Sequence, residues 1–386
     1  MEEKYNYKIC RVAISYPTSE LPGAGLVNYY LTKNIKLKTL YLTIKRKGIP
    51  KEIDSNNLTI KFFNIANKSS SIFFSKKIEK KISFFSKIYI YLVILKKGKG
   101  LNFFFRSIIP ILKFNPDLIA CHSILTIMQG VFFKILFRKK FVLHLHNMSD
   151  ANAINNLYIL RFFVAMSDRI YCVSKPMTEI LQNKLPAKKI ILTSTGVDPK
   201  IFFNQNILRK KQILMVGRIH WNKGYKYMLQ AMKKLVKKFP DYNLLIIGDG
   251  EEVSALINLV DNLGLKNYVT IKSKASHSEL VTFYNESKLF VMSSLYEGLP
   301  KVLLESFACG LPAVITDQCN AEKISENRAE IVKTKSSDDL FMSISRLISD
   351  KSRWQKYSNN CVSIIETHNW DIISKSINND YDTIMK

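Results

Sequence analysis

The sequence predicts an α/β protein of two domains, each formed by a mostly parallel, doubly wound sheet with helices on its faces. Its 386 residues exceed the length of one typical domain, and 47% of them are hydrophobic, which is enough for sizeable cores. Short apolar segments alternate with stretches of helical pattern, as in strands joined by crossover helices. The alternation passes into a second series around residues 185–200, so we expect one domain on each side.

Six apolar segments of the N-terminal half are predicted to be strands. They lie at residues 8–16, 39–44, 58–65, 117–123, 140–146 and 169–174. A turn that contains Gly23 and Gly25 follows the first of them. Glycines between a strand and a helix allow the backbone to approach a ligand closely, although an ordinary turn has the same pattern.

Two of these strands carry a histidine at or near their ends, His122 and His146. Open α/β sheets bind ligands at the carboxyl ends of their strands, which makes both residues candidates. A single histidine is more often structural, so each signal is weak alone. His144 points to the same sheet face as His146 and is expected to be packed.

The second series predicts five strands and the helices between them. The strands lie at residues 212–219, 243–248, 268–273, 288–294 and 312–317, and the helices at 224–239, 251–263 and 278–287. Arg218 and Lys223 bracket the loop after the first of these strands. Two cations at this edge of a sheet can neutralise a diphosphate, and the alternative is a pair of solvated basic residues.

The segment 293–312, SSLYEGLPKVLLESFACGLP, carries Glu297 and Glu305 eight positions apart. Pro300 suits the first position of a helix, and Gly310 suits the position just past its end. A helix N-terminus is a ready phosphate site, and two acids beside it suit the hydroxyls of a ribose and of a sugar. An ordinary buried helix with two solvated glutamates is the alternative.

Positive charge is concentrated in the N-terminal half. The net charge is +27, and residues 1–185 hold 30 basic and 10 acidic side chains, which accounts for +20 of it. Residues 61–113 combine 12 basic residues and a single acid with many Phe and Tyr residues. This pattern suits an anionic membrane surface, but also a solvated basic face or, less well, nucleic acid.

The six cysteines form no C-x-x-C pair and mostly fall in apolar segments, which predicts buried free thiols in a reducing compartment. The N-terminal residues do not have the pattern of a secretory signal. The longest apolar run, at residues 84–95, is interrupted by Lys87 and is too short to span a bilayer.

Taken in order, these motifs resemble glycosyltransferase family 4 and its relatives. The resemblance rests on Gly217-Arg218 with Lys223-Gly224, then IIGDGEE, then SSLYEGLPKVLLESFACGLPAVIT. The N-terminal half matches more loosely through HSILT, HLHN, YCVSK and TGVD. This resemblance implies the GT-B fold, with two Rossmann-like domains facing across a cleft. The expected division is an acceptor domain at 1–186, a nucleotide-sugar domain at 187–365, and a helix at 366–386 that crosses back to the first domain.

The resemblance also implies roles for individual residues. Arg218 and Lys223 would bind the donor diphosphate, Glu305 the ribose hydroxyls, and Glu297 the hydroxyls of the transferred sugar. The other donor-binding positions would be Gly23, Gly25, Gly298, Leu299, Lys301 and Val302, of which Lys301 and Val302 contribute backbone amides. His146 would contact the donor sugar or order the acceptor. The expected catalytic set is Glu297, Arg218, Lys223 and His146.

The expected reaction is transfer of a sugar from a nucleotide-diphosphate donor, of UDP or GDP type, with retention of anomeric configuration. The acceptor would be a glycan, lipid-linked if the basic–aromatic segment binds a membrane, in the synthesis of a bacterial surface polysaccharide or lipopolysaccharide. No metal is expected, because Arg218 and Lys223 would supply the positive charge. The enzyme would be cytoplasmic and peripherally bound to the inner face of the cytoplasmic membrane.

Other readings of the sequence stay open. A sugar-nucleotide epimerase or a phosphorylase would use the same two-domain fold. A non-catalytic partner subunit would use it for binding alone, against which the four intact residues Arg218, Lys223, Glu297 and Glu305 argue. A nucleic-acid binder is disfavoured, because no nucleic-acid motif accompanies the charge.

Overall fold

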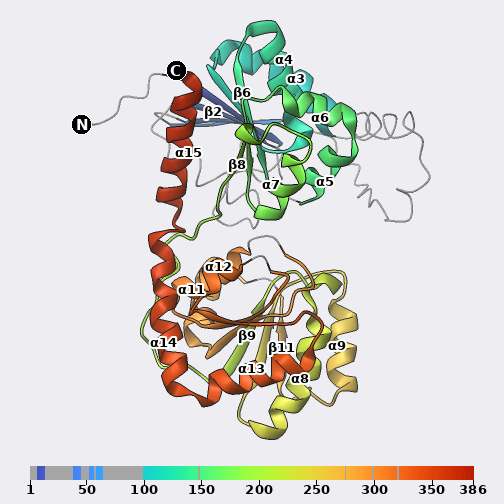
Figure 1. Cartoon of the computed structure of the whole chain (residues 1–386), viewed down its shortest axis with the longest axis vertical. Coiled ribbons are helices and arrows are strands. Elements are labelled where there is room, and N and C mark those ends of the chain that lie inside the picture. Colours follow the sequence, from blue (N-terminus) through green and yellow to red (C-terminus); the bar gives the residue numbers. More distant parts are fainter. Residues whose placement is uncertain are drawn as a thin grey trace, which may run out of the picture. The chain divides into compact units, whose positions relative to one another are not determined.

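A computed structural model describes residues 7–13, 38–44, 52–55, 58–63, 99–146, 148–273, 275–297, 300–319 and 321–386 (Figure 1). The chain forms two compact units. The first comprises Met1–Thr193 with Ser374–Lys386, and the second comprises Ser194–Ile373.

The first unit is built on a sheet with the strand order β3-β4-β2-β1-β5-β6-β7-β8. The strands are β1 (Ile9–Val12), β2 (Thr39–Ile44), β3 (Glu52–Ser55), β4 (Leu58–Phe63), β5 (Leu118–Cys121), β6 (Lys140–Leu145), β7 (Arg169–Cys172) and β8 (Ile190–Leu192). Its neighbouring strands pair in parallel, except that β3 is antiparallel to β4. The helices of its described residues, apart from a last one at the C-terminus, are α3 (Lys99–Phe114), α4 (Ile127–Phe137), α5 (Met148–Asn156), α6 (Tyr158–Ala165) and α7 (Lys175–Gln182).

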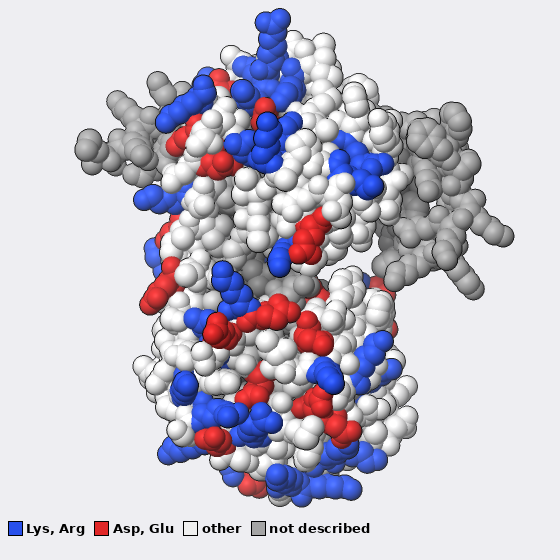
Figure 2. All heavy atoms as spheres, viewed as in Figure 1, with Lys and Arg blue, Asp and Glu red and all other residues white. Residues whose placement is uncertain are grey.

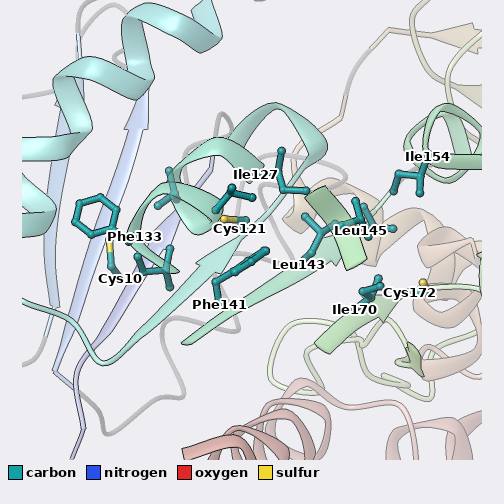
Figure 3. Close-up of a cluster of buried hydrophobic side chains, with 14 of the residues drawn as sticks. Cys10, Cys121, Ile127, Phe133, Phe141, Leu143, Leu145, Ile154, Ile170 and Cys172 are labelled. Carbon is teal, nitrogen blue, oxygen red and sulfur yellow. The ribbon is translucent and has the colours of Figure 1, made fainter. Parts of the chain in front are cut away.

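The two faces of this sheet bury different kinds of side chain. One face carries an apolar core in which Phe141 and Leu143 of β6 pack with Phe133 of α4 (Figure 3). Gly130 brings α4 against the sheet, because a Cβ atom there would lie 2.5 Å from the ring of Phe141. The alternate positions point to the other face, and they include a buried arginine, Arg11 of β1. Tyr381 of helix α15 (Trp370–Met385) meets that face, where its ring lies 5.8 Å from the guanidinium carbon of Arg11 and its hydroxyl 2.6 Å from Nε2 of His144.

The second unit has the strand order β11-β10-β9-β12-β13-β14, with every neighbouring pair parallel. The strands are β9 (Gln212–Val216), β10 (Asn243–Ile247), β11 (Val269–Lys272), β12 (Leu289–Met292), β13 (Ala313–Thr316) and β14 (Ala329–Val332). The helices are α8 (Tyr225–Lys238), α9 (Val253–Asn262), α10 (His277–Glu286), α11 (Lys301–Ala308), α12 (Glu322–Ser325), α13 (Ser337–Ser349) and α14 (Lys351–Val362).

Both faces of the second sheet are apolar and covered by helices. Along β9, Ile213 and Met215 enter one core, which they share with α8 and α13, while Leu214 enters the core on the opposite face with α11. This is the doubly wound arrangement, in which successive residues of one strand serve two cores. The predicted α/β class with two mostly parallel sheets is therefore confirmed.

Two further sequence predictions concern the whole chain. The six cysteines are all buried and free, as expected. Among the described residues, no helix is long and apolar enough to cross a membrane. The middle of the basic–aromatic segment, residues 64–98, lies outside the described residues.

Candidate functional site

Lys223 is presented by a tight turn between β9 and α8. A short 3₁₀ helix, Trp221–Lys223, leads into Gly224, whose φ of 65° lies in the left-handed region. A Cβ atom on Gly224 would lie 2.0 Å from the carbonyl oxygen of Ser293, so the turn can approach the neighbouring loop only at a glycine. The sequence therefore requires glycine at this position for two independent reasons.

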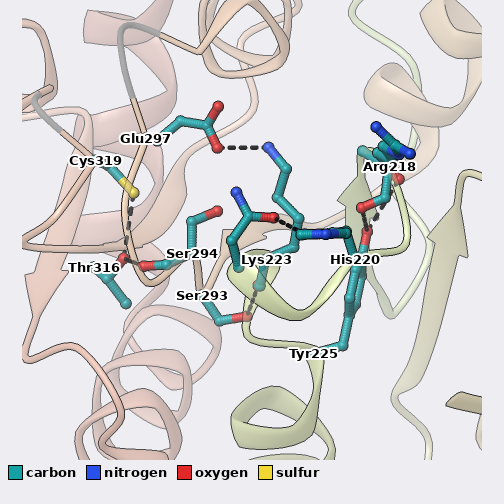
Figure 4. Close-up of polar contacts among 11 residues, drawn as sticks. Arg218, His220, Lys223, Tyr225, Ser293, Ser294, Glu297, Thr316 and Cys319 are labelled. Atoms are coloured by element: carbon teal, nitrogen blue, oxygen red, sulfur yellow. Dashed lines mark hydrogen bonds and ion pairs between the residues drawn. The ribbon is translucent and has the colours of Figure 1, made fainter. Parts of the chain in front are cut away.

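The turn is fastened to the loop that follows β12. The hydroxyl of Ser293 donates to the carbonyl oxygens of Lys223 and Gly224, at 3.0 and 3.1 Å (Figure 4). The amide of Leu295 donates to the carbonyl oxygen of Asn222 at 2.7 Å. Because β9 and β12 are neighbours in the sheet, their two loops meet at the carboxyl edge and share these bonds.

Lys223 and Glu297 form the central ion pair of the site. Their side chains are about one-fifth exposed, and Nζ lies 2.5 Å from Oε2. The backbone of Glu297 is also fixed, since its amide donates to the carbonyl oxygen of Gln318 at 2.9 Å. A partly buried and geometrically fixed pair is shielded from solvent, unlike an exposed one.

Arg218 belongs to a separate ion pair. It lies on the other side of His220 from Lys223 (Figure 4), and its Nη2 is 2.5 Å from Oε1 of Glu251. Both side chains of this pair are more than half exposed. The two predicted cations thus share one loop, but only Lys223 contacts a predicted acid.

Glu305 lies inside α11 and is buried. Tyr284 of α10 donates its hydroxyl proton to Oε2 of Glu305, at 3.0 Å. Burial raises the pKa of the Glu305 carboxyl, and the Tyr284 hydrogen bond and the charge of Lys301 oppose that rise. Burial also lowers the pKa of Lys301 to about 8, which the charge of Glu305 opposes. A cation and an anion therefore lie together at the start of α11.

The ends of α11 are close to their predicted positions. Pro300 is the N-cap residue with φ −80° and ψ 122°, so the helix begins one residue later than predicted. Gly310 has a φ of 66° just past the C-cap, as predicted. The start of α11 is the positive end of the helix dipole, which makes this end suitable for an anion.

The remaining predicted residues are distributed as follows. Gly23, Gly25, Gly298 and Leu299 lie outside the described residues. His146 belongs to the first unit, where it directly follows β6 and contacts His122. Within the described ranges, no group of three or more His, Cys, Asp or Glu side chains is placed to hold a metal ion.

Several supporting residues were not identified from the sequence. Ser293 and Asn222 fix the turn, and Tyr284 holds Glu305. These residue types are common, and no motif distinguishes their positions in the sequence. Only the folded arrangement of the second unit brings them to the site. Arg11 was also missed, although a charged residue inside the otherwise apolar run ICRVAI was a usable signal.

Comparison with known families agrees with this arrangement. Residues 197–363 match the family model "Glycosyl transferases group 1", and residues 77–201 match "Glycosyltransferase Family 4". The chain belongs to these glycosyltransferases. An uncharacterized glycosyltransferase of Methanocaldococcus jannaschii is 26% identical to this glycosyltransferase over 299 residues, which cover 70% of the chain and 76% of that protein.

Another relative is N,N'-diacetylbacillosaminyl-diphospho-undecaprenol alpha-1,3-N-acetylgalactosaminyltransferase of Campylobacter jejuni. It is 27% identical over 252 residues, which cover 60% of the glycosyltransferase chain and 64% of the relative. A shorter match, to an uncharacterized glycosyltransferase of Haemophilus influenzae, is 33% identical and covers 39% of the chain and 42% of that protein. The chain therefore spans about two-fifths to three-quarters of the length of these relatives.

Solved structures confirm the GT-B fold of the glycosyltransferase. Sucrose-phosphate synthase from Thermosynechococcus elongatus has a TM-score of 0.80 at 17% identity, covering 98% of this chain and 99% of that one. The Anabaena protein HepE, solved in complex with UDP and glucose, has a TM-score of 0.75 at 15% identity, covering 98% and 100%. At these identities the likeness concerns the fold.

Proposed function

We propose that the protein is a retaining glycosyltransferase that moves a sugar from a nucleotide-diphosphate donor, of UDP or GDP type, to a glycan acceptor. The observation that carries the proposal is the Lys223–Glu297 ion pair. Lys223 lies on the loop after β9, and Glu297 lies on the loop after β12, which leads into α11. It offers one group for a phosphate and one for a hydroxyl at the same point. Structural neighbours solved with UDP and with UDP-glucose support a nucleotide-sugar donor.

When the donor binds, Lys223 and Glu297 would give up their ion pair and each would contact a different part of the donor. The ammonium of Lys223 would turn to the diphosphate, and Glu297 would accept hydrogen bonds from hydroxyls of the transferred sugar. The first amides of α11 would bind the phosphate, and Glu305, deeper in that helix, would accept from the ribose hydroxyls. Arg218, which is exposed, would be available to the diphosphate once it leaves Glu251.

The same groups suit the chemical step. As the bond between the anomeric carbon and the diphosphate breaks, negative charge builds on the leaving group, and Lys223 and the helix amides stabilise it. The acceptor hydroxyl would attack from the face that the diphosphate leaves, and a leaving phosphate oxygen would take its proton. The configuration at the anomeric carbon would then be retained, and no carboxylate would act as a nucleophile.

The test combines binding with turnover. UDP, GDP, ADP and dTDP sugars are compared for the rise in melting temperature that they cause, since a ligand bound only to the folded state must raise it. With the best donor, Lys223→Ala is expected to lower kcat about a hundredfold or more, as for loss of a preorganised charge at a leaving group. Lys233→Ala, an exposed lysine on α8, is the matched control.

Three outcomes would contradict the proposal. Turnover of Lys223→Ala within a few-fold of the wild type would show that Lys223 does not contribute to the reaction. Conversion of the donor to another sugar nucleotide without an acceptor would indicate an epimerase. An inverted anomeric configuration in the product would exclude retention.

We further propose that the first unit binds the acceptor and a membrane, at the inner face of the cytoplasmic membrane. The Campylobacter relative is named for a diphospho-undecaprenol substrate, which supports a lipid-linked acceptor and a role in surface polysaccharide or lipopolysaccharide synthesis. One side of α3 exposes Phe105, Ile109 and Leu112, at 61%, 63% and 42%. Arg106 and Lys113 are exposed beside them, which gives the apolar and basic combination that suits anionic lipid.

Liposome flotation tests this surface. The protein is expected to float with anionic vesicles and much less with neutral ones, and Phe105→Ser with Ile109→Ser is expected to reduce flotation about tenfold or more. Leu208→Ser, at a 95% exposed position of the second unit, removes a comparable apolar side chain as a control. Equal flotation of all three proteins, or none with either lipid, would contradict membrane binding.

A further inference from the structure

Three histidines of the first unit stack on one another at the carboxyl edge of its sheet. The ring of His122 lies 4.6 Å from that of His144 and 5.6 Å from that of His146, with interplanar angles of 17° and 3°. Tyr171 continues the stack at 4.5 Å from His144. His122 and His144 are buried, with exposures of 3% and 2%.

A buried arginine leads into this stack. Arg11 of β1 is fully buried, and its Nη1 lies 3.1 Å from Nε2 of His122. On the other side of the same ring, Nδ1 of His122 lies 3.4 Å from Nε2 of His146. The three side chains therefore form one line of hydrogen bonds, from Arg11 through His122 to His146.

The chemistry of arginine fixes the direction of that line. A guanidinium only donates, so Nε2 of His122 must accept and carries no proton. The ring then holds its proton on Nδ1 and donates it to Nε2 of His146. His146 consequently accepts at Nε2 and holds its own proton on Nδ1. A protonated His122 or His146 would oppose two N–H groups across one of these contacts.

We propose that Arg11 and His122 are positioning residues that fix His146 as the neutral tautomer with its proton on Nδ1. Nε2 of His146 is then occupied by the His122 proton, so this nitrogen does not accept a proton from a substrate. The tautomer follows from the described contacts alone. Only its consequence for sugar transfer rests on the proposed function.

The electrostatic surroundings agree with neutral rings. Burial lowers the pKa of His122 well below 6.5, and the charges of Arg11, His144 and His146 lower it further. Burial and Arg11 also lower the pKa of His144. The hydroxyl of Tyr381 lies 2.6 Å from Nε2 of His144, which keeps this third histidine out of the line.

The direct test is the protonation state of the six histidines of the full chain. Protein labelled with ¹⁵N in its histidines gives long-range ¹H–¹⁵N spectra that separate protonated from unprotonated ring nitrogens. The signals of His122 and His146 are assigned from the variants that lack them. At pH 7 both rings are expected to carry a proton on Nδ1 only. A proton on Nε2 of His146 would overturn the proposal.

Two substitutions of His122 separate its two bonds. Asparagine places an amide near Nδ1 and can still donate to His146, whereas glutamine places its amide near Nε2 and can serve Arg11 but not His146. His122→Gln is therefore expected to mix the tautomers of His146 and to lower kcat about tenfold. His122→Asn is expected to keep the tautomer and to lose clearly less activity.

Controls distinguish failure of the proposed hydrogen-bond relay, from Arg11 through His122 to His146, from failure of the proposed glycosyltransferase function. Nucleotide affinity is expected to be unchanged in both variants, because Lys223, Glu297 and Glu305 belong to the second unit. Equal effects of His122→Asn and His122→Gln on the His146 tautomer would overturn the relay. If no donor supports transfer by the wild type, the proposed function fails, and the spectra still decide the tautomer.

Discussion

Lys301 is a residue whose charge depends on pH close to neutrality. It is the first residue of α11, and burial lowers the pKa of its ammonium to about 8, against the opposing charge of Glu305. In the proposed donor pose this group stands beside the amides that bind the phosphate. Its charge is then part of the attraction for the donor, and it is present below pH 8 and lost above it.

Nucleotide affinity is therefore expected to weaken as the pH rises through about 8. Loss of one nearby positive charge is expected to weaken binding by about tenfold, or 1.4 kcal/mol. Isothermal titration of the nucleotide between pH 7 and 9 measures this change. Lys301→Arg keeps the charge across that range and is expected to remove the pH dependence. A flat profile for the wild type would show that Lys301 lies away from the phosphate.

At the scale of elements, the turn between β9 and α8 combines a backbone constraint with a steric one. Gly224 is in the left-handed region and its Cα faces the carbonyl oxygen of Ser293. Gly264, just after α9, has a similar φ of 69° but no atom within 4 Å of where a Cβ would stand. The two glycines therefore separate the cost of conformation from the cost of contact.

Gly264→Ala is expected to lower the free energy of unfolding by about 1 to 2 kcal/mol, the cost of a left-handed alanine. Gly224→Ala carries the same cost and also pushes the turn away from the β12 loop, which moves Lys223 from Glu297. We expect a clearly larger loss of stability and a loss of donor turnover for Gly224→Ala alone. Denaturant unfolding and kcat measure the two effects, and equal losses in both variants would contradict the contact.

The central elements were predictable from the sequence, because a strand buried on both faces is a continuous apolar run. All eleven predicted strands are present, and among the described residues their ends differ from the predicted ones by up to three positions. The three missed strands, β3, β8 and β14, lie at the ends of the two sheets. An edge strand is only partly buried, so a polar segment such as EIDS in β3 gives no apolar signal.

The site was predictable only in part. The sequence identified Lys223, Glu297 and Glu305 as residue types with a shared use, and the structure brings the first two into contact. They are 74 positions apart, so their contact depends on β9 and β12 being neighbours, which local pattern does not encode. For the same reason the hydrogen bond between Tyr284 and Glu305 had no signal in the sequence.

At the scale of the whole molecule, the surface of the second unit and the interior of the first unit differ in how their charged groups are arranged. Basic and acidic side chains intermingle on the visible face of the second unit (Figure 2). Inside the first unit, by contrast, Arg11 and the stacked histidines gather buried cationic or protonatable groups. The elements packed around them add Tyr171 of β7 and Tyr381 and Asp380 of α15, of which Asp380 accepts a hydrogen bond from Tyr171.

This cluster is expected to make the protein sensitive to acid. The pKa of His122 and of His144 is lowered in the folded state, so below their ordinary value of 6.5 the unfolded chain binds more protons. Stability is therefore lost as the pH falls from about 6.5, by up to about 1.4 kcal/mol per pH unit for each histidine. Melting temperatures between pH 7.5 and 5 measure the loss.

A matched pair of variants locates the effect. His144→Gln removes one protonatable ring and is expected to flatten the acid slope, whereas His220→Gln, at a partly exposed histidine of the second unit, is expected to leave it unchanged. Equal slopes in the wild type and His144→Gln would place the acid sensitivity elsewhere.

The burial of all six thiols has a practical consequence. Burial raises the pKa of every cysteine, so the reactive thiolate is scarce and inaccessible in the folded protein. A cysteine introduced at an exposed position, such as Lys233, would then be the preferred target of a maleimide fluorophore or a spin label. Distances between labelled positions in the two units could be followed by spectroscopy without first removing any native cysteine.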